Sequence, residues 1–325
     1  MNKNIKVGVI GAGIQGVSNA LFLQKKGFEV TIFDRDIPGS HVASYGNAGH
    51  FSPYASVPLN RPDVLGDIPA MLMSSSGPLA LKWNYVPKMI PWFLKYLKNC
   101  NKQSALHTAK YMHQILNLSN DAYEEIFKEI NINNLVEKKG IIYVWTNKNL
   151  KSREFEIKVR NDLGIEQKLL TQKEILKLEP NLNPVFDAGV IYENAMHARD
   201  PHGILKEIFK LFIKKGGKFI KENIKSIKQS DENETIIKSE LTEYKFEKSV
   251  IASGAFSKKL TDQLDEKIPL DTERGYHVHF KNMDHLISRP VIFLDRGFGM
   301  TPMNQGLRAV GTVELGGLKN PPSKK

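Results

Sequence analysis

Three glycines near the start of the chain have the spacing of a phosphate-binding turn. The stretch Gly11-Ala-Gly-Ile-Gln-Gly16 reads G-x-G-x-x-G, between an apolar strand at 5–10 and a helix at 17–27. The first glycine permits a sharp turn, the second lets the backbone approach a pyrophosphate, and the third lets the helix pack closely on the strand. The helix N-terminus would hold the negative charge. We therefore expect a dinucleotide to bind at Ile10, Gly11, Ala12, Gly13, Ile14, Gln15 and Gly16.

An acidic residue follows the next strand. Residues 29–33 read as a strand ending in Asp34, about 20 residues past the glycines, where a ribose 2′-hydroxyl needs an acceptor. Arg35 comes next, and a basic residue there could receive the 2′-phosphate of NADP. Asp34 would repel that phosphate, so the pattern favours a free ribose, as in FAD or NAD.

A polar, glycine-rich loop at 37–56 could wrap the cofactor with its backbone N–H groups. At this length we favour a functional loop over a plain surface loop. A nicotinamide-dependent enzyme would normally continue here with another strand and helix, so the loop counts against that class.

Composition and net charge limit the number of domains and the classes of protein to which the chain can belong. A chain of 325 residues suggests about two domains, and 41% hydrophobic with 25% charged residues is ordinary for a globular protein. The net charge of +11 comes from scattered lysines, so we favour a solvated surface, then weak attraction to anionic lipid, and last nucleic acid. Cys100 is the only cysteine, which excludes an internal disulfide and a C-x-x-C site and fits a reducing compartment. With no signal peptide and no long apolar run, we expect a cytoplasmic protein, with the inner face of the plasma membrane as an alternative.

The middle of the chain reads as mainly helical and the end as strands. Residues 78–83 and 89–98 combine aromatic residues with lysines, and we favour a helix packed on the core, with lysines reaching outward, over a membrane-surface helix. Residues 104–135 read as one helix, and a charged helix follows at 149–163. Thr171 and Glu174 form a capping box, and the section 275–313 is rich in strands. The apolar face predicted for 104–135 consists of Ala105, Tyr111, Ile115, Leu118, Ala122, Ile126 and Ile130.

Four stretches in this order resemble the FAD-dependent D-amino acid oxidoreductases and, within that family, the bacterial D-amino acid dehydrogenases. The first is the glycine motif with Asp34, and the second is Ser44-Tyr-Gly-Asn-Ala-Gly49, similar to a loop that lies over the flavin. The third is Val250-Ile-Ala-Ser-Gly-Ala255, and the fourth is Pro269-Leu-Asp-Thr-Glu-Arg-Gly-Tyr-His277 with residues 306–314 behind it. Relatives often carry Glu at the position of Asp34, and either acid can accept from ribose.

The resemblance implies an α/β fold with two interleaved domains and FAD as cofactor. A Rossmann-type FAD-binding domain of the D-amino acid oxidase-like (GR2) class would take 1–56 and 191–264. A substrate domain built on an antiparallel sheet would take 57–190 and 265–325. Relatives continue with a segment that supplies a carboxylate-binding arginine and returns to the flavin, and 315–325 does not match it, so we expect that segment to be absent. The further FAD contacts implied are Arg35, Ser44, Asn47, Ala48, Gly49, Ile224, Ala252, Ser253 and Gly254.

The chemistry implied is oxidative deamination of a D-amino acid to a 2-oxo acid and ammonia, with electrons passed to a carrier or quinone. The substrate carboxylate needs a cation, and arginine offers bidentate geometry. The candidates are Arg274 and Arg308, with Tyr276 as a hydrogen-bonding partner. Alternatives remain open: Arg274 could pair with Glu273 or Asp271, Arg308 could lie on an exposed strand face, and Tyr276 could be sheet core.

Histidines are weaker candidates. His277 and His279 alternate with Tyr276 and are expected on the opposite face, His50 follows the flavin loop, and His197 and His202 look structural. None has the carboxylate spacing of a metal site, and no metal is predicted. Two other functions stay open: a related oxidoreductase acting on glycine, sarcosine or hydroxyproline, and an inactive, truncated flavin-fold protein. An NAD-dependent dehydrogenase is disfavoured.

Overall fold

The chain forms two compact units. The computed structural model describes residues 5–40, 43–66, 79–147 and 150–323. The first unit comprises Met1–Asn47, Ile126–Ile132 and Pro201–Thr272, and the second comprises Ala48–Glu125, Asn133–Asp200 and Glu273–Lys325. Parts of three predicted features lie outside the described residues: 41–42 of the polar loop, Pro78 of the amphipathic stretch and 149 of the charged helix.

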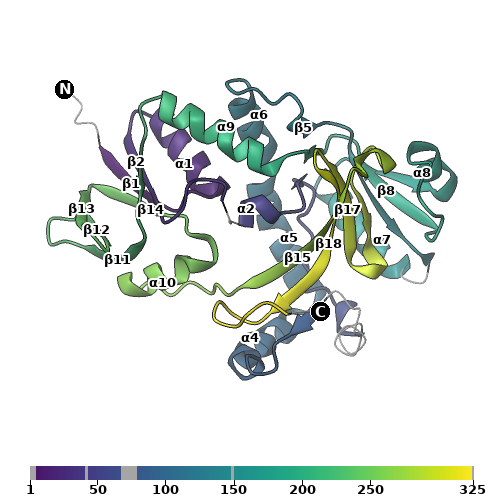
Figure 1. Cartoon of the computed structure of the whole chain (residues 1–325). Helices are drawn as coiled ribbons and strands as arrows, with labels where there is room; N and C mark the ends of the chain where they lie inside the picture. Colours follow the sequence, from purple (N-terminus) through teal and green to yellow (C-terminus); the bar gives the residue numbers. More distant parts are fainter. Residues whose placement is uncertain (1–4, 41–42, 67–78, 148–149, 324–325) are drawn as a thin grey trace. The chain divides into compact units, whose positions relative to one another are not determined.

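A four-stranded parallel sheet forms the centre of the first unit. Its order is β10 (Lys218–Lys221), β2 (Glu29–Asp34), β1 (Lys6–Ile10) and β14 (Lys248–Ile251). Helices α1 (Ile14–Lys25) and α9 (Pro201–Lys214) lie side by side next to it (Figure 1). The predicted strand–turn–helix–strand is confirmed, with the helix beginning three residues earlier than expected.

A three-stranded antiparallel sheet packs on the parallel one. It consists of β11 (Ile224–Gln229), β12 (Thr235–Ser239) and β13 (Glu243–Phe246). Phe33 of β2 packs with Ile237 and Phe246 in the shared core. At Gly8 of β1 a Cβ atom would approach Ile237 to 2.6 Å, so this glycine lets the two sheets pack closely.

An eight-stranded sheet is the largest sheet of the second unit and carries the predicted substrate-side residues. It is antiparallel except for two parallel pairs, β16 with β6 and β4 with β18. The long strands β15 and β18 run side by side, yellow-green and yellow in Figure 1. The order is β15 (Glu273–Lys281), β18 (Gly306–Leu315), β17 (Phe298–Met303), β16 (Val291–Phe293), β6 (Ile141–Trp145), β8 (Ala188–Tyr192) and β7 (Lys168–Thr171), with β4 (Leu79–Leu81) beside β18.

A small sheet in the second unit begins inside the segment that was predicted as a loop. Residues 37–56 contain the short helix α2 (Ala43–Gly46) and the strand β3 (His50–Phe51). Strand β3 pairs with β9 (Met196–Ala198), which pairs with β5 (Val136–Glu137). Because these partners are distant in sequence, local composition could not show the pairing.

The prediction of one helix over 104–135 is wrong. Helix α5 (Lys102–Leu116) ends before α6 (Ser119–Phe127) begins, and the Ser119 hydroxyl donates to the carbonyl of Leu116 at 2.6 Å. Part of the predicted core face is also wrong, since Ile115 is 74% exposed. The side of α5 that packs inward carries Ala105 and Ala109, because small side chains allow close approach.

The remaining helices are short or charged. The capping box is confirmed, since Thr171 N–H donates to Glu174 Oε2 at 2.8 Å and Glu174 N–H donates back to the Thr171 hydroxyl at 3.4 Å. These elements are α4 (Val86–Asn99), α7 (Leu150–Asp162), α8 (Gln172–Leu178) and α10 (Ser257–Thr261), with the 3₁₀ turns η2 (Gly254–Phe256), η3 (Asp262–Leu264), η4 (Asp284–Leu286) and η5 (Leu294–Arg296).

Candidate functional site

The three glycines of the first turn are needed for different reasons. Gly11 has a φ of +113°, and a Cβ there would lie 2.4 Å from the carbonyl oxygen of Ala252. At Gly16 a Cβ would lie 1.8 Å from the carbonyl oxygen of Gly11. At Gly13 a Cβ would meet only Ser44 Oγ, at 3.4 Å, and φ is an ordinary −71°. The fold therefore requires glycine at 11 and 16, whereas Gly13 leaves open space over the backbone.

Asp34 lies against this turn. Its Oδ2 accepts from the N–H of Ala12 at 2.7 Å, and its Oδ1 accepts from the N–H of Asp36 at 3.0 Å. An ionised carboxylate has about four acceptor positions, so two remain for a ribose hydroxyl. The carboxylate is thus held by backbone groups in the position that the motif requires.

Two further predicted stretches meet the glycine turn within the first unit. The Ser44 hydroxyl accepts from the N–H of Ile14 at 3.0 Å, which satisfies one of the free amides at the start of α1. On the other side, the N–H of Ala252 and the hydroxyl of Ser253 both donate to the carbonyl of Ile10, at 2.8 and 3.0 Å. The second glycine motif therefore abuts the first.

Other predicted cofactor residues of this unit have contacts of their own. The Arg35 guanidinium lies 4.9 Å from the centre of the Phe256 ring, and Asn47 donates to the carbonyl of Ser44 at 3.1 Å. Ile224 packs at the edge of the core of its unit, and Gly254 has a φ of +55° where η2 begins. Their contacts with a cofactor stay a prediction.

A dinucleotide fits these residues. Gly13 leaves open the space that a side chain would fill, and as the N-cap residue it has no side chain that could cap α1, whose first turn also contains no acidic residue. A diphosphate would therefore meet backbone N–H groups and the positive end of the helix dipole without a competing anion.

The second unit holds the end of the predicted flavin loop, Ala48 and Gly49, with His50 directly after it. The Thr301 hydroxyl of β17 donates to the carbonyl of Ala48 at 2.9 Å and lies 2.8 Å from Nε2 of His50. Gly49 has a φ of +75°, and a Cβ there would lie 2.8 Å from the Met303 side chain, so glycine is required. Thr301 therefore helps to fix this part of the loop to the large sheet.

Arg308 lies beside that threonine. It is the register partner of Thr301 on one side and of His279 on the other, so the three side chains share one face of the sheet. Arg308 is 3% exposed, so the open alternative of an exposed strand face is wrong. Burial, with the nearby Arg308 charge, lowers the pKa of His277 and of His279.

Arg274 and Tyr276 meet a different group. Arg274 donates to Glu314 Oε1 at 2.6 Å and to the carbonyl of Asn320 at 2.8 Å, so its ion pair is with Glu314 and not with Glu273 or Asp271. The Tyr276 hydroxyl accepts from the N–H of Ser323 at 2.8 Å. Burial would raise the pKa of Glu314, but hydrogen bonds from Ser323 and Arg274 and the Lys82 charge outweigh it and lower that pKa.

Two histidines, the half-buried His50 and the fully buried His197, support the flavin loop. His50 and His197 are register partners in β3 and β9. Burial lowers the pKa of His50 to about 4, helped by His197. Burial also lowers the pKa of His197 to about 4, against the opposing pull of Glu137. Both rings are therefore uncharged near neutral pH, and Arg308 supplies the positive charge next to Thr301.

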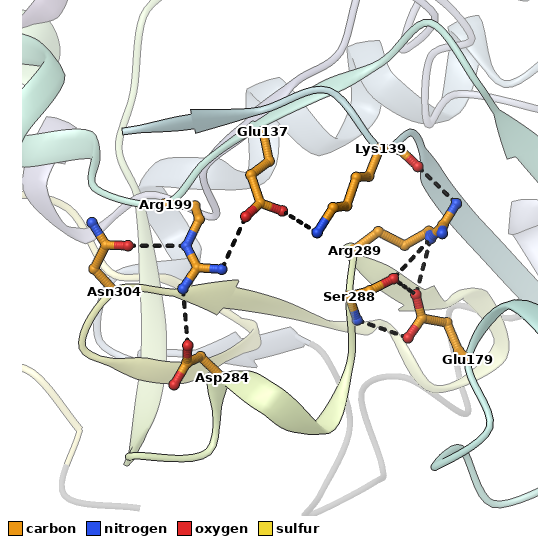
Figure 2. A network of polar contacts seen from close by, with 8 residues as sticks. All are labelled: Glu137, Lys139, Glu179, Arg199, Asp284, Ser288, Arg289 and Asn304. Atoms are coloured by element: carbon orange, nitrogen blue, oxygen red, sulfur yellow. Dashed lines mark hydrogen bonds and ion pairs between the residues drawn. The ribbon is translucent and has the colours of Figure 1, made fainter. Parts of the chain in front are cut away.

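A polar network fastens the small sheet to the large one within the second unit (Figure 2). Arg199 donates to Glu137 at 3.1 Å, Asp284 at 2.9 Å and Asn304 at 2.9 Å. Burial would raise the pKa of Glu137, but Lys139 and Arg199 outweigh it and lower that pKa. The network joins β5 and Arg199, which directly follows β9, to η4 and to the turn between β17 and β18.

The same figure shows a second cluster next to the first. Glu179 accepts from the N–H of Ser288 at 2.8 Å and from Nε of Arg289 at 2.9 Å, and Arg289 also donates to the carbonyl of Lys139 at 2.8 Å. Every charge in both clusters has a protein partner. We therefore interpret them as structural supports.

Helix α7, predicted only as charged, buries three of its charged side chains. Arg153 and Arg160 both pair with Glu156, at 2.6 and 3.1 Å, and Arg61 also contacts Glu156. Asp63 lies 3.4 Å from Arg61, and Asp295 lies 3.9 Å from Arg153. Three arginines thus face three carboxylates, which satisfies the need of buried charges for partners.

Sequence reasoning missed Thr301 and Glu314. Thr301 lies in a strand without a motif, and Glu314 only ends the stretch 306–314, to which no role for Glu314 was assigned. Only strand register places Thr301 beside Arg308 and Glu314 beside Arg274. Within the described residues, no group of three or more His, Cys, Asp or Glu side chains could hold a metal ion. No helix there is long and apolar enough to cross a bilayer.

Comparison with known proteins identifies the family of this chain. The family model described as FAD dependent oxidoreductase (DAO) matches residues 6–324. The chain is 31% identical over 321 residues to a D-amino-acid oxidase of Bradyrhizobium diazoefficiens, covering 98% of this chain and 76% of the relative. It is 26% identical over 319 residues to a D-amino acid dehydrogenase of Vibrio atlanticus, covering 96% and 76%.

Solved structures share the fold. Glycine oxidase from Geobacillus kaustophilus superposes with a TM-score of 0.65 at 17% identity, covering 99% of this chain and 73% of that one. L-proline dehydrogenase from P. horikoshii gives a TM-score of 0.67 at 16% identity, covering 100% and 74%. The predicted α/β flavoprotein fold is confirmed. The chain belongs to the DAO family of FAD-dependent oxidoreductases, and its cofactor is FAD.

Proposed function

We propose that this oxidoreductase converts D-amino acids to 2-oxo acids and ammonia and passes the electrons to a carrier or quinone. Two kinds of observation support the substrate class. The relatives named above are a D-amino-acid oxidase at 31% identity and a D-amino acid dehydrogenase at 26%. The second unit also provides a buried cation of the kind that a carboxylate needs.

The position of Arg308 carries the proposal. It is buried, it shares a sheet face with Thr301, and Thr301 holds the carbonyl of Ala48 in the loop that resembles the flavin-covering loop. A guanidinium can bind a carboxylate through two parallel hydrogen bonds, which fixes both position and orientation. We therefore assign the substrate carboxylate to Arg308 because of its place beside Thr301, and we assign to Arg274 the structural ion pair with Glu314.

The roles of the chain follow from this assignment. FAD bound there would supply the acceptor for the hydride from the substrate Cα. Gly13 and the start of α1 hold the diphosphate, and Asp34 accepts from the ribose. Arg308 holds the carboxylate, while the uncharged His50 and His197 keep the loop in place without adding a charge that would compete for it. No protein acid or base is required if the substrate amine arrives neutral, and water then releases ammonia from the imino acid.

The test is an anaerobic absorption spectrum of the purified chain loaded with FAD. We expect the visible flavin band to bleach on addition of D-alanine or a mixture of D-amino acids, and not with the L-enantiomers. Reoxidation by a soluble quinone faster than by oxygen would support the dehydrogenase form. Bleaching by glycine or sarcosine alone, or by L-amino acids, would contradict the proposed substrate class.

A further inference from the structure

We propose that strand β15 pairs edge to edge with β15 of a second copy of the chain, in an antiparallel twofold arrangement centred on His277. We call Glu273–Lys281, with the outer side that faces away from β18, the β15 edge. The proposal concerns an interaction between two copies and is independent of the substrate proposed above. A second copy is the occupant because the strand is complementary in charge to its own reversed sequence.

Strand β15 lies at one end of the large sheet and is paired on one side only. Its neighbour is β18, and no other strand of the described residues pairs with its outer side. The strand at the opposite end of the sheet, β7, has four residues, whereas β15 has nine. An unpaired edge presents a row of backbone N–H and C=O groups that can pair with another chain. The β15 edge is therefore the longer of the two template strands.

The β15 edge lacks the features that usually prevent such pairing, which include proline and β-bulges. It contains no proline. The register shift between Gly275 and His277 arises from an extra residue in β18, so β15 itself is regular. Val278 is 58% exposed and Phe280 is 44% exposed, so apolar side chains of the strand are uncovered. The edge is therefore regular and accessible.

The charges at the two ends of the β15 edge match each other. Antiparallel pairing about His277 places each residue opposite the one that lies equally far on the other side of the centre. Glu273 then faces Lys281 of the second copy, and the twofold axis produces this ion pair twice. Neither residue forms an ion pair within the described part of its own chain. Each copy thus supplies the partner that the other copy lacks.

The remaining opposed side chains are compatible with close approach. Tyr276 faces Val278, and pairs of an aromatic with a β-branched residue stabilise neighbouring strands. His277 meets its own counterpart. Burial and the nearby Arg308 charge lower the pKa of His277, so the two rings are uncharged at neutral pH. No two like charges face each other in this register.

The neighbouring registers do not have this complementarity. With the centre at Tyr276, Glu273 faces a histidine and Lys281 lies beyond the end of the opposite strand. With the centre at Val278, Glu273 lies beyond the end and Lys281 faces a glycine. Only the centre at His277 pairs the strand over its whole length and matches both charges. Because each copy uses its β15 edge in this pairing, the assembly closes at two chains.

The experiment is sedimentation equilibrium of the FAD-loaded full chain. We expect a monomer–dimer equilibrium in the micromolar range and no larger species. Glu273→Lys places like charges opposite each other twice and should raise the dimer dissociation constant about 30-fold. Glu273→Lys combined with Lys281→Glu restores opposite charges and should restore the dimer. Glu232→Lys makes the same charge change at an exposed turn of the first unit and should have no effect.

The outcomes that contradict the pairing are distinct. A chain that stays monomeric up to about 100 µM would overturn the proposal, as would assembly beyond two chains. A dimer that Glu273→Lys leaves unchanged, or that the exchange of both charges does not restore, would show that the chains associate elsewhere.

Cysteine variants test the register directly. Opposed Cβ atoms lie about 5 Å apart, so a short thiol crosslinker should join two chains of His277→Cys. Gly275→Cys is the matched control, because a Cβ there meets no atom within 4 Å and two such residues would lie about 13 Å apart along the strands. Mixing Gly275→Cys with His279→Cys should restore crosslinking, since these residues face each other. The native Cys100 is buried. Equal crosslinking of His277→Cys and Gly275→Cys alone would overturn the proposed register.

Discussion

The glycine turn of the first unit and the arginine strands of the second were both predicted from motifs. In the structure, however, the glycines and the arginines differ in the kind of contact that fixes their role. At the turn, Gly11 and Gly16 lie so close to neighbouring carbonyls that no other residue fits. On the strands, Arg274 and Arg308 looked equally suited to a carboxylate. The structure pairs Arg274 with Glu314 and buries Arg308 beside Thr301.

The difference lies in what each site depends on. The turn is defined by backbone sterics over a few consecutive residues, so its sequence nearly specifies its shape. The role of an arginine depends on which side chains the sheet register brings beside it, and the register is set by partners far along the chain. The four predictions below test these two kinds of dependence.

Replacing Gly13 by valine should have the largest effect. The fold tolerates a Cβ at this position, but the side chain would fill the space where the diphosphate approaches the backbone. We expect FAD affinity to fall about thousandfold, or about 4 kcal/mol, as measured by flavin titration. Gly66→Val is the matched control, because open space surrounds Gly66. Full FAD retention in Gly13→Val would show that the diphosphate does not bind at this turn.

Replacing Gly16 by alanine should damage the fold itself. A Cβ at 1.8 Å from the Gly11 carbonyl oxygen forces the backbone apart, at a cost of about 3 kcal/mol in the free energy of unfolding. Gly13→Ala makes only an ordinary contact and should unfold at nearly the wild-type denaturant concentration. Similar denaturation midpoints for the two variants would show that the turn is looser than its geometry implies.

The same distinction between local and long-range contacts explains which features could be predicted from the sequence. The first βαβ unit and the Thr171 capping box were predictable, because each is specified by neighbouring residues. The break between α5 and α6 was not, because no glycine or proline marks it. The exposure of Ile115 could not be predicted either. The spacing of apolar residues shows that a helix has an apolar face, but it does not show which part of that face packs on the core. The partners Thr301 and Glu314 required the register.

Arg308 and Arg274 can be separated by kinetics. If Arg308 binds the substrate carboxylate, Arg308→Leu should lower kcat/KM about hundredfold, or about 2.7 kcal/mol, mainly through KM. Arg308→Lys should recover part of the loss, because it keeps the charge but not the bidentate geometry. The readout is steady-state oxidation of D-alanine, with FAD content measured for every variant.

Arg274→Leu is the matched control for the same experiment. It should leave kcat/KM within about threefold and instead lower stability, because it removes a partner of the buried Glu314 carboxylate. A hundredfold loss in Arg274→Leu together with a small loss in Arg308→Leu would reverse the assignment. Arg274 would then be the residue that binds the substrate carboxylate.

The smallest effect concerns the support beneath the flavin loop. Burial lowers the pKa of His197 from its ordinary 6.5 to about 4, so between these values the unfolded chain takes up a proton that the folded chain does not. Stability should therefore be complete above about pH 6.5 and fall as the pH decreases. From about pH 7.5 to about pH 5.5, His197 alone should account for a loss of about 1.3 kcal/mol in the free energy of unfolding.

The variant His197→Asn isolates this contribution because asparagine does not titrate. Urea unfolding at the two pH values gives the loss for each protein, and groups that titrate equally in both cancel in the difference. We expect the loss to be smaller by about 1.3 kcal/mol in His197→Asn. Equal losses would mean that His197 is hydrated and protonates in place. The small sheet of β3, β9 and β5 would then admit water beneath the loop, unlike the glycine turn, where close backbone contacts leave no space.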